Sequence, residues 1–391
     1  MTARVVVVGA GYAGVGTINA LQAEIEDEAE ITWISEHDYH LVLHEVHRVI
    51  RDPSIASKIT LPISDIKAPE TEFVQSHVTE VDVDDRLVHM DGGDQIEYDY
   101  LLMAIGSQTA FYGIDGLREH AYELKGVEDA RSIHGAVTEA AKEATLSSSA
   151  QVVVGGAGLS GIQAAGEIAE FRDEQRAPID VTLVEGLDEV FPGNDPDLQS
   201  RLRSRLEGRD IGIETGEFIS EVDDETVYLG GGNDEETETL PYDVLLWTGG
   251  ITGPAELGDM NVDRDERSDR VVAESDFTTS DERVFALGDT ALINQGDTVV
   301  PPTAQAAWRA ADVAGENLAR AIRDEPLDTW AHSDQGTAIS VGENAVVHDV
   351  PGIPIETFGG LPARLIKKAI AARWIATASS VGRGISAFSD M

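Results

Sequence analysis

The chain has 391 residues, enough for two or three domains that each bury a core. It holds 72 acidic and 28 basic residues, and the formal net charge of −44 excludes a nucleic-acid partner because phosphates would be repelled. So acidic a surface is typical of a protein adapted to molar salt, where charges are screened beyond about 3 Å. The absence of cysteine excludes disulfides, thiolate metal sites and any mechanism with a redox-active cysteine pair.

The chain begins with a dinucleotide-binding pattern. An apolar run leads into Gly-Ala-Gly-Tyr-Ala-Gly at residues 9–14, and a helix-like stretch follows. Gly9 permits a tight turn, Gly11 lets a pyrophosphate approach the backbone, and Gly14 lets the helix pack close to the sheet. The next strand-like run ends at Glu36, whose carboxylate can accept hydrogen bonds from ribose hydroxyls.

The same plan recurs in the middle of the chain. A second apolar run leads into Gly156-Ala-Gly158-Leu-Ser-Gly161, and the following strand-like run ends at Glu185. Each copy also has a later strand introduced by Tyr-Asp, at residues 98–99 and 242–243, at a similar distance from its first glycine. Two matches with similar internal spacing predict an α/β fold with two Rossmann-like dinucleotide-binding domains.

A third element indicates which unit holds which cofactor. The strand-like run at residues 283–287 ends in Gly288-Asp289. An aspartate there can bond the ribityl hydroxyls of a flavin, which a nicotinamide dinucleotide lacks. We therefore assign FAD to the first unit and NADH to the second.

With these motifs the chain resembles the flavoproteins with two dinucleotide-binding domains and, within them, the type II NADH:quinone dehydrogenases. The resemblance covers nearly the whole chain. Its most specific motif is Pro-Pro-Thr-Ala-Gln-Ala-Ala at residues 301–307, which is similar to the family's quinone-side motif. The resemblance implies an FAD-binding domain made of residues 1–118 and 255–330, an inserted NADH-binding domain at 119–254, and a small C-terminal region at 331–391.

The motifs and the resemblance together give candidate cofactor residues. For FAD these are Gly9, Gly11, Tyr12, Ala13, Gly14, Glu36, Val78, Ala104, Gly106, Asp289, Thr303, Ala304 and Gln305. For NADH they are Gly156, Gly158, Gly161, Glu185 and Gly249. N–H groups near Thr303 and Ala304 would stabilise negative charge on the flavin, with ordinary helix packing as the alternative. Glu185 favours NADH because its carboxylate would repel a 2′-phosphate.

Three residues are candidates for catalysis on the quinone side. Gln305 matches a family glutamine thought to line the quinone pocket, and Arg309 stands where the family commonly has a second glutamine. The guanidinium of Arg309 could donate to a quinone oxygen or form a salt bridge. Glu167 matches a family carboxylate near the nicotinamide, and burial would raise its pKa and suit it to relay protons; a surface glutamate is the alternative.

Three histidines, His40, His44 and His47, lie close together in the sequence. Their spacing is not that of the metalloprotease motif, in which three residues separate the two histidines. We interpret them as structural residues and predict no metal site.

The tail differs in charge from the rest of the chain, because residues 361–391 hold five basic residues and one acidic residue. On a helical wheel for about 361–378, one broad apolar face holds Leu361, Leu365, Ile366, Ala369, Ile370 and Trp374, and the opposite face holds Arg364, Lys367 and Lys368. A basic amphipathic helix with a tryptophan is typical of a segment that lies on a membrane. Packing on the acidic body or on a dimer partner is the alternative.

Together these features predict an FAD-dependent oxidoreductase that passes hydride from NADH to FAD and then to a membrane quinone, without pumping protons. No run of apolar residues is long enough to span a bilayer and no signal peptide is visible, so we expect a peripheral enzyme on the cytoplasmic face of the cell membrane. Sulfide:quinone and disulfide reductases need cysteines and are excluded. The alternatives are an NADH-dependent flavoprotein reductase for a soluble carrier such as ferredoxin, and a non-catalytic FAD-binding protein. Whether the chain forms a homodimer is left open by the sequence.

Overall fold

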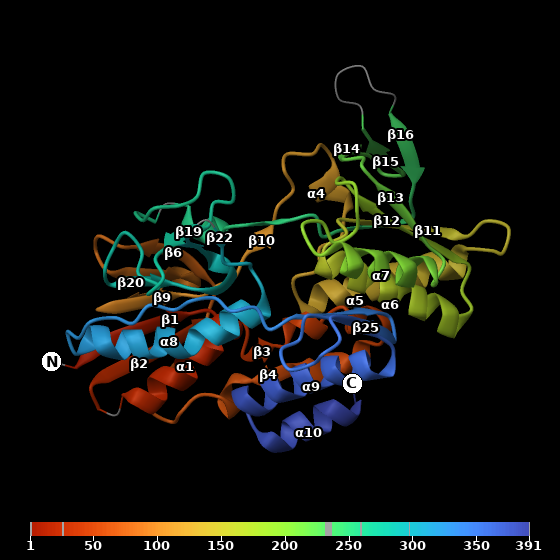
Figure 1. The fold of residues 1–391 in the computed structure, drawn as a ribbon. Helices are drawn as coiled ribbons and strands as arrows, with labels where there is room; N and C mark the ends of the chain where they lie inside the picture. The colour runs from red at the N-terminus through yellow and green to blue at the C-terminus, as the bar shows by residue number, and fades with distance from the viewer. Residues whose placement is uncertain (1, 26, 231–236, 259, 297, 391) are drawn as a thin grey trace.

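The computed structural model describes residues 2–25, 27–230, 237–258, 260–296 and 298–390. It contains two parallel β-sheets with helices packed against them and smaller sheets at their margins (Figure 1). This arrangement confirms the predicted α/β class with two Rossmann-like units, followed by C-terminal helices.

The first sheet has five parallel strands with the N-terminal strand at its centre. In spatial order they are β20 (Val284–Ala286), β9 (Tyr100–Met103), β1 (Ala3–Val8), β2 (Ala29–Ser35) and β5 (Glu72–Gln75). The run Val5–Val8 is fully buried, which explains why it is apolar without alternation: both faces of a central parallel strand are covered. Helix α1 (Tyr12–Glu24) follows directly, so the first glycine-rich segment joins a strand end to a helix start.

The second sheet repeats this plan with four parallel strands. They are β13 (Ile211–Thr215), β12 (Ile179–Glu185), β11 (Ala150–Gly155) and β17 (Val244–Trp247). Helix α6 (Leu159–Gln175) follows β11 as α1 follows β1.

The two Tyr-Asp pairs occupy equivalent places in the two units. The carboxylate of Asp99 accepts a hydrogen bond from the backbone N–H of Arg4 in β1, at 2.8 Å. The carboxylate of Asp243 accepts one from the backbone N–H of Gln151 in β11, at 2.7 Å. In both units this aspartate ties the later strand to the first one, which gives the repeated motif a structural reason.

The chain returns to the first sheet after completing the second. Strand β20 pairs with β9, and helix α8 (Ala304–Ile322) packs along α1. The two helices approach closely because glycines lie at their contact. A Cβ on Gly16 would lie 2.5 Å from the Cβ of Ala311, and a Cβ on Gly315 would lie 2.5 Å from the Cβ of Ala20. This packing holds the start of α8 beside the first glycine-rich segment.

Smaller elements complete the two units. The strands are β3 (Tyr39–Leu41), β4 (Thr60–Pro62), β6 (Val78–Asp82), β7 (Leu87–Met90), β8 (Gln95–Glu97), β10 (Gln108–Thr109), β14 (Ile219–Val222), β15 (Thr226–Leu229), β16 (Glu238–Pro241), β18 (Ile251–Thr252), β19 (Val271–Ala273), β21 (Ala291–Gln295) and β22 (Thr298–Val299). The helices are α2 (Arg48–Arg51), α3 (Ala56–Ile59), α4 (Leu117–His120), α5 (Val127–Glu143) and α7 (Pro196–Glu207). In Figure 1 the sheet β14–β15–β16 lies at the far end of the second unit.

The C-terminal region is a three-stranded antiparallel sheet and two helices. The strands are β23 (Thr337–Val341), β24 (Asn344–His348) and β25 (Thr357–Gly359), and the helices are α9 (Leu361–Ala378) and α10 (Val381–Asp390). The bounds of α9 match the predicted helix, whereas α10 was not predicted. The two helices pack on each other below the first unit (Figure 1).

The orientation predicted for α9 holds for part of the helix. Leu361, Leu365 and Ile370 of the predicted apolar face are exposed. Trp374 of the same face is only 1% exposed, however, and Lys367 of the predicted basic face is buried as well. The side of α9 that meets the protein combines these two with small residues, Ala363, Ala371 and Ala378. A helical wheel groups residues by polarity and therefore missed an inward face that mixes alanines, one tryptophan and one lysine.

Candidate functional site

The first glycine-rich segment forms a loop that can hold a pyrophosphate. Gly9 has φ +106, and a Cβ on Gly14 would lie 2.0 Å from the carbonyl oxygen of Gly9, so the turn and the start of α1 are in tight contact. Around Gly11, in contrast, no atom lies within 4 Å of the place a Cβ would take. Open space there, at the amino end of a helix with no acidic residue in its first turn, suits an anion.

The other candidate residues of the adenosine half lie on several elements of the first unit. Glu36 is exposed just beyond β2. Val78 is buried at the start of β6. Ala104 is buried directly after β9, and a Cβ on Gly9 would lie 2.1 Å from the Ala104 carbonyl oxygen. Ala13 is buried in the first turn of α1.

The side chain of Tyr12 lies away from solvent. Its hydroxyl bonds to Nδ1 of His44, and its ring centroid lies 4.8 Å from that of Trp374 in α9. Only its backbone is therefore available to a phosphate.

A second group of residues lies where β20 ends. Asp289 follows Gly288, which has φ +73, and the Asp289 carboxylate accepts a hydrogen bond from the hydroxyl of Ser107 at 3.4 Å. The ammonium of Lys125 donates to that hydroxyl at 2.9 Å, and the Lys125 pKa is lowered by burial against the opposing pull of Asp289. Lys125 was not predicted as part of this group, because no local motif links it to the Gly-Asp strand end. Gly106 bonds through its N–H to Thr290, at 2.8 Å.

The start of α8 faces this group. Thr303 is the N-cap, and its hydroxyl accepts a hydrogen bond from the backbone N–H of Ala306 at 3.2 Å. Ala304 begins the helix, so its N–H has no partner within the helix, and the first turn of the helix holds no acidic residue that would neutralise the positive end of the helix dipole. A small hollow lies beside the helix start, lined by Gly288, Thr303, Ala306 and other residues. The N–H donors at the start of α8 fit the negatively polarised edge of a flavin.

The second glycine-rich segment has the same geometry as the first. Gly156 has φ +93, and its Cβ would lie 2.7 Å from the Cα of Gly249. A Cβ on Gly161 would lie 1.8 Å from the Gly156 carbonyl oxygen, whereas around Gly158 the space is open. The Glu185 carboxylate at the end of β12 accepts hydrogen bonds from the backbone N–H of Ala157, at 2.8 Å, and of residue 187, at 3.1 Å. The carboxylate is thus held at the edge of the loop, where a ribose would lie.

Gln305 and Arg309 both contact the loop before β23. The Gln305 amide donates to the carbonyl oxygen of Gly336 at 3.1 Å and accepts from the N–H of Gln335 at 3.2 Å. Arg309 is exposed and donates to the side chain of Gln335 at 3.2 Å. Gln305 keeps one N–H and one lone pair for a substrate, whereas the guanidinium of Arg309 faces solvent.

Glu167 lies on α6 and is 1% exposed. Burial raises its pKa to about 7, although the positive charges of Arg51, Arg48 and Lys367 act in the opposite direction. A surface glutamate is therefore ruled out for this position, and the carboxyl group can hold or release a proton near neutral pH.

Lys367 joins the same region from α9. Its ammonium donates to the hydroxyl of Ser340 at 2.6 Å and to the side-chain oxygen of Gln163, and it lies 3.3 Å from Nε2 of His47. Burial lowers the pKa of Lys367, and the nearby carboxylate of Glu45 opposes that shift. These contacts of Lys367 were not predicted, because the helical wheel placed it on the outer face.

The three neighbouring histidines have structural partners. His40 donates from Nδ1 to the carbonyl oxygen of Ala10 at 2.7 Å and accepts at Nε2 from the indole N–H of Trp374 at 2.8 Å. Burial lowers its pKa to about 4, so it stays neutral in this role. Among the described residues, the group with metal-ligand spacing is Asp195, His348 and Glu356, to which none of these three histidines belongs.

Comparisons with known proteins agree with this geometry. The sequence model of the pyridine nucleotide-disulphide oxidoreductase family matches residues 3–311. A type II NADH:quinone oxidoreductase of Staphylococcus saprophyticus is 28% identical over 97% of this chain and 96% of its own length.

Two solved structures share the fold. NDH2 from Plasmodium falciparum, solved with NADH, has a TM-score of 0.86 at 15% identity, over 100% of this chain and 98% of its own. The sulfide:quinone oxidoreductase of Aquifex aeolicus has a TM-score of 0.80 at 21% identity, over 96% of this chain and 91% of its own.

Proposed function

The chain belongs to the pyridine nucleotide-disulphide oxidoreductase family, and from that premise we propose that it is a type II NADH:quinone oxidoreductase. It passes hydride from NADH through bound FAD to a membrane quinone and pumps no protons. One observation carries the proposal: two phosphate loops with the same geometry lie on one chain, and curated type II enzymes match that chain over nearly its whole length.

The composition separates this activity from others on the same scaffold. The chain has no cysteine, so it cannot carry the thiol chemistry of disulfide or sulfide oxidation. Hydride transfer between two stacked rings requires orientation and a stabilised flavin charge, and it requires no thiol.

FAD is assigned to the first unit on the fit of three features. They are the open space at Gly11, the exposed carboxylate of Glu36 and the donors at the start of α8 near Ala304. Asp289 would bond the ribityl chain. When bound, the flavin accepts two electrons from NADH and delivers them to the quinone.

NADH is assigned to the second unit. The open space at Gly158 suits its pyrophosphate, and Glu185 suits its ribose hydroxyls. A 2′-phosphate would meet the charge of Glu185, so NADH is preferred over NADPH.

The quinone ring is assigned to the region between α8 and the C-terminal sheet. Gln305 has a free N–H for a quinone oxygen, and Glu167 provides a buried carboxyl group that titrates near neutrality. We assign no substrate contact to Arg309, because it is exposed and bonded to Gln335.

The domain division follows from the strand pairing. Residues 1–118 and 255–330 would form the FAD-binding domain, since β20 joins the first sheet, and 119–254 would form the inserted NADH-binding domain. Residues 331–391 would form the membrane-facing region.

Membrane contact is proposed for the outer face of the tail. Val381, Ile385 and Phe388 recur at i, i+4 and i+7 along α10 and are exposed, and Leu361 and Leu365 are exposed on α9. Such a surface binds the lipid interface without crossing it, and none of the described helices is long and apolar enough to span a bilayer. We place this contact on the cytoplasmic face; a homodimer through the same surface is the alternative.

An anaerobic titration tests the proposal. Protein purified in molar salt is expected to contain FAD, to lose its flavin absorbance on stoichiometric NADH, and to recover it when a short-chain quinone is added. Bleaching without reoxidation by quinone, but with reoxidation by a soluble ferredoxin, would replace the proposal with the carrier-reductase alternative. A protein that takes up no FAD would contradict both.

A further inference from the structure

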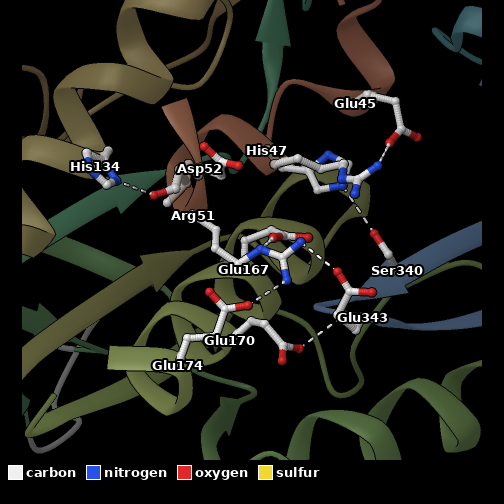
Figure 2. Close-up of polar contacts among 12 residues, drawn as sticks. Glu45, His47, Arg51, Asp52, His134, Glu167, Glu170, Glu174, Ser340 and Glu343 are labelled. Atoms are coloured by element: carbon white, nitrogen blue, oxygen red, sulfur yellow. Dashed lines mark hydrogen bonds and ion pairs between the residues drawn. The ribbon is translucent and has the colours of Figure 1, made fainter. Parts of the chain in front are cut away.

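One arginine, Arg51 at the end of α2, contacts three carboxylates. Its Nε lies 3.0 Å from Glu167, Nη1 lies 3.3 Å from Glu174, and Nη2 lies 2.7 Å from Glu343. Figure 2 shows the guanidinium between α6, which carries two of these carboxylates, and the turn between β23 and β24, which carries the third. Only 10% of the Arg51 side chain is exposed.

The surrounding backbone fixes this meeting point. A Cβ on Gly166 of α6 would lie 2.5 Å from the backbone nitrogen of Gly342, so the β23–β24 turn is seated directly on the helix. The N–H of Glu343 donates to Glu170 of α6 at 2.9 Å. Glu167 is thus enclosed between its own helix, this turn and Arg51.

Glu167 is also surrounded by charged and titratable groups from the neighbouring elements. They are Glu45, His47, Arg48 and Arg51 from the segment around α2, Glu170 and Glu174 from α6, Glu343 from the β23–β24 turn, and Arg364, Lys367 and Lys368 from α9. Of the positive ones, Arg51 has the largest effect on its pKa. Within the described part of the chain, Oε2 of Glu167 has no aligned hydrogen-bond partner, so the contact with Arg51 is a charge contact that leaves this oxygen open to a proton.

We propose that Arg51 is a positioning residue for the quinone reaction, which holds Glu167 in place and sets the pH range over which Glu167 can deliver a proton. The inference rests on the proposed function. Arg51 belongs to the first unit and would act only through the side chain of Glu167, which belongs to the second.

The overall reaction requires such a proton. NADH, one H⁺ and a quinone give NAD⁺ and a quinol, so each turnover takes one proton from water. Glu167 lines a hollow that also borders Ser340, Glu343 and Lys367, and the proton would reach the carboxyl group from this side. Glu167 can pass that proton inward only while it is protonated, so turnover falls as the pH rises through its pKa.

Arginine is the suitable residue for this position. Its planar fork presents one nitrogen to each carboxylate, whereas a lysine ammonium is a single point charge. Lysine would keep most of the charge effect and lose the fixed orientation.

The test compares three variants by the pH profile of kcat for a short-chain quinone. Arg51→Gln removes the positive charge that lowers the pKa of Glu167 most. The pH at which kcat falls on the alkaline side should therefore rise by about 1 to 3 pH units. Arg51→Lys should move it less. Arg209→Gln is the matched control, because Arg209 is 17% exposed and pairs with Glu170 and Asp173 on the same helix without contacting Glu167; its profile should match the wild type.

A second readout is independent of turnover. The infrared band of the protonated Glu167 carboxyl group, identified by its loss in Glu167→Gln, should titrate near pH 7 in the wild type and higher in Arg51→Gln. Reduction of a soluble dye by NADH should be the same in Arg51→Gln, Arg51→Lys and Arg209→Gln as in the wild type, which shows that FAD and NADH binding survive in these three variants.

The outcomes separate the two proposals. A wild type that reduces dye but no quinone contradicts the proposed function. A wild type that reduces quinone, with Arg51→Gln and Arg51→Lys titrating like Arg209→Gln in both readouts, overturns the role of Arg51. If Arg51→Gln does not fold, the Arg51→Lys comparison decides.

Discussion

The carboxyl group of Glu167 links stability to pH. Its pKa is about 7 in the folded protein, against 4.5 for an ordinary glutamate, and burial is the main cause. Between these values the folded protein holds a proton that the unfolded chain has released. Unfolding therefore becomes easier as the pH rises through this window, by about 3 kcal/mol in all.

This effect can be measured with Glu167→Gln. Denaturant unfolding between pH 4.5 and 8 should show a fall in the wild-type free energy of unfolding that the variant lacks. Equal slopes in the two proteins would mean that Glu167 is already charged when folded.

The carboxylate of Glu185 is predicted to determine the affinity for NADH. Glu185→Ala removes a charged acceptor for the ribose and two bonds that shape the loop, so the KM for NADH should rise about 10- to 100-fold and the preference over NADPH should shrink. Glu214→Ala, an exposed glutamate on the neighbouring strand β13, is the control and should leave both values unchanged. An unchanged KM in Glu185→Ala would contradict the assignment of NADH to this strand end.

Single residues were predictable where a local motif fixes them. The glycines and strand-end acids lie where the fingerprint requires, because their role depends on neighbours in the sequence. Arg51, Lys125 and Lys367 were not predictable, since their partners are far away in the chain and only the fold brings them together.

At the scale of elements, the outer face of the tail carries the membrane prediction. The triple variant Leu365→Gln, Ile370→Gln and Ile385→Gln should bind liposomes at least about tenfold more weakly, because each buried apolar side chain contributes about 1.5–3 kcal/mol. Turnover with a soluble dye should not change.

The control replaces exposed apolar residues elsewhere. Leu146→Gln, Phe218→Gln and Val299→Gln lie outside residues 331–391 and should leave liposome binding unchanged. Equal binding by the two triple variants and the wild type would show that the tail is not the contact surface.

The two tail helices also show the limits of pattern reading. The bounds of α9 follow from its apolar and basic residues, but which side faces inward depends on the surface it meets. Helix α10 was missed because Gly382 and Gly384 are poor helix formers. A Cβ on Gly384 would lie 2.6 Å from the carbonyl oxygen of Ala372, so close packing on α9 explains its presence.

For the whole molecule, the charge of −44 predicts a dependence on salt. Raising KCl from 0.1 M to 2 M shortens the screening length from about 10 Å to less than about 3 Å and weakens repulsion between surface carboxylates. The midpoint of thermal unfolding should therefore rise steadily over this range. A midpoint that falls or stays constant would contradict salt adaptation.

The architecture was predictable at this scale because it is a duplication. Each copy repeats its strand, loop and acid in sequence, so the two sheets could be expected. How the C-terminal sheet is seated on α6 could not, because a contact such as Gly166 against Gly342 leaves no periodic signal.

The hydrogen bond from Trp374 to His40 has a practical consequence for the design of truncated variants. His40 in turn holds the carbonyl oxygen of Ala10 inside the first glycine-rich loop, so the last long helix supports the place where the cofactor's phosphates would bind. A truncation before residue 374, intended to yield a water-soluble enzyme, should also produce a protein that loses its yellow colour. Solubility is better sought by altering the exposed apolar side chains of α9 and α10 while both helices are kept at full length, including Trp374.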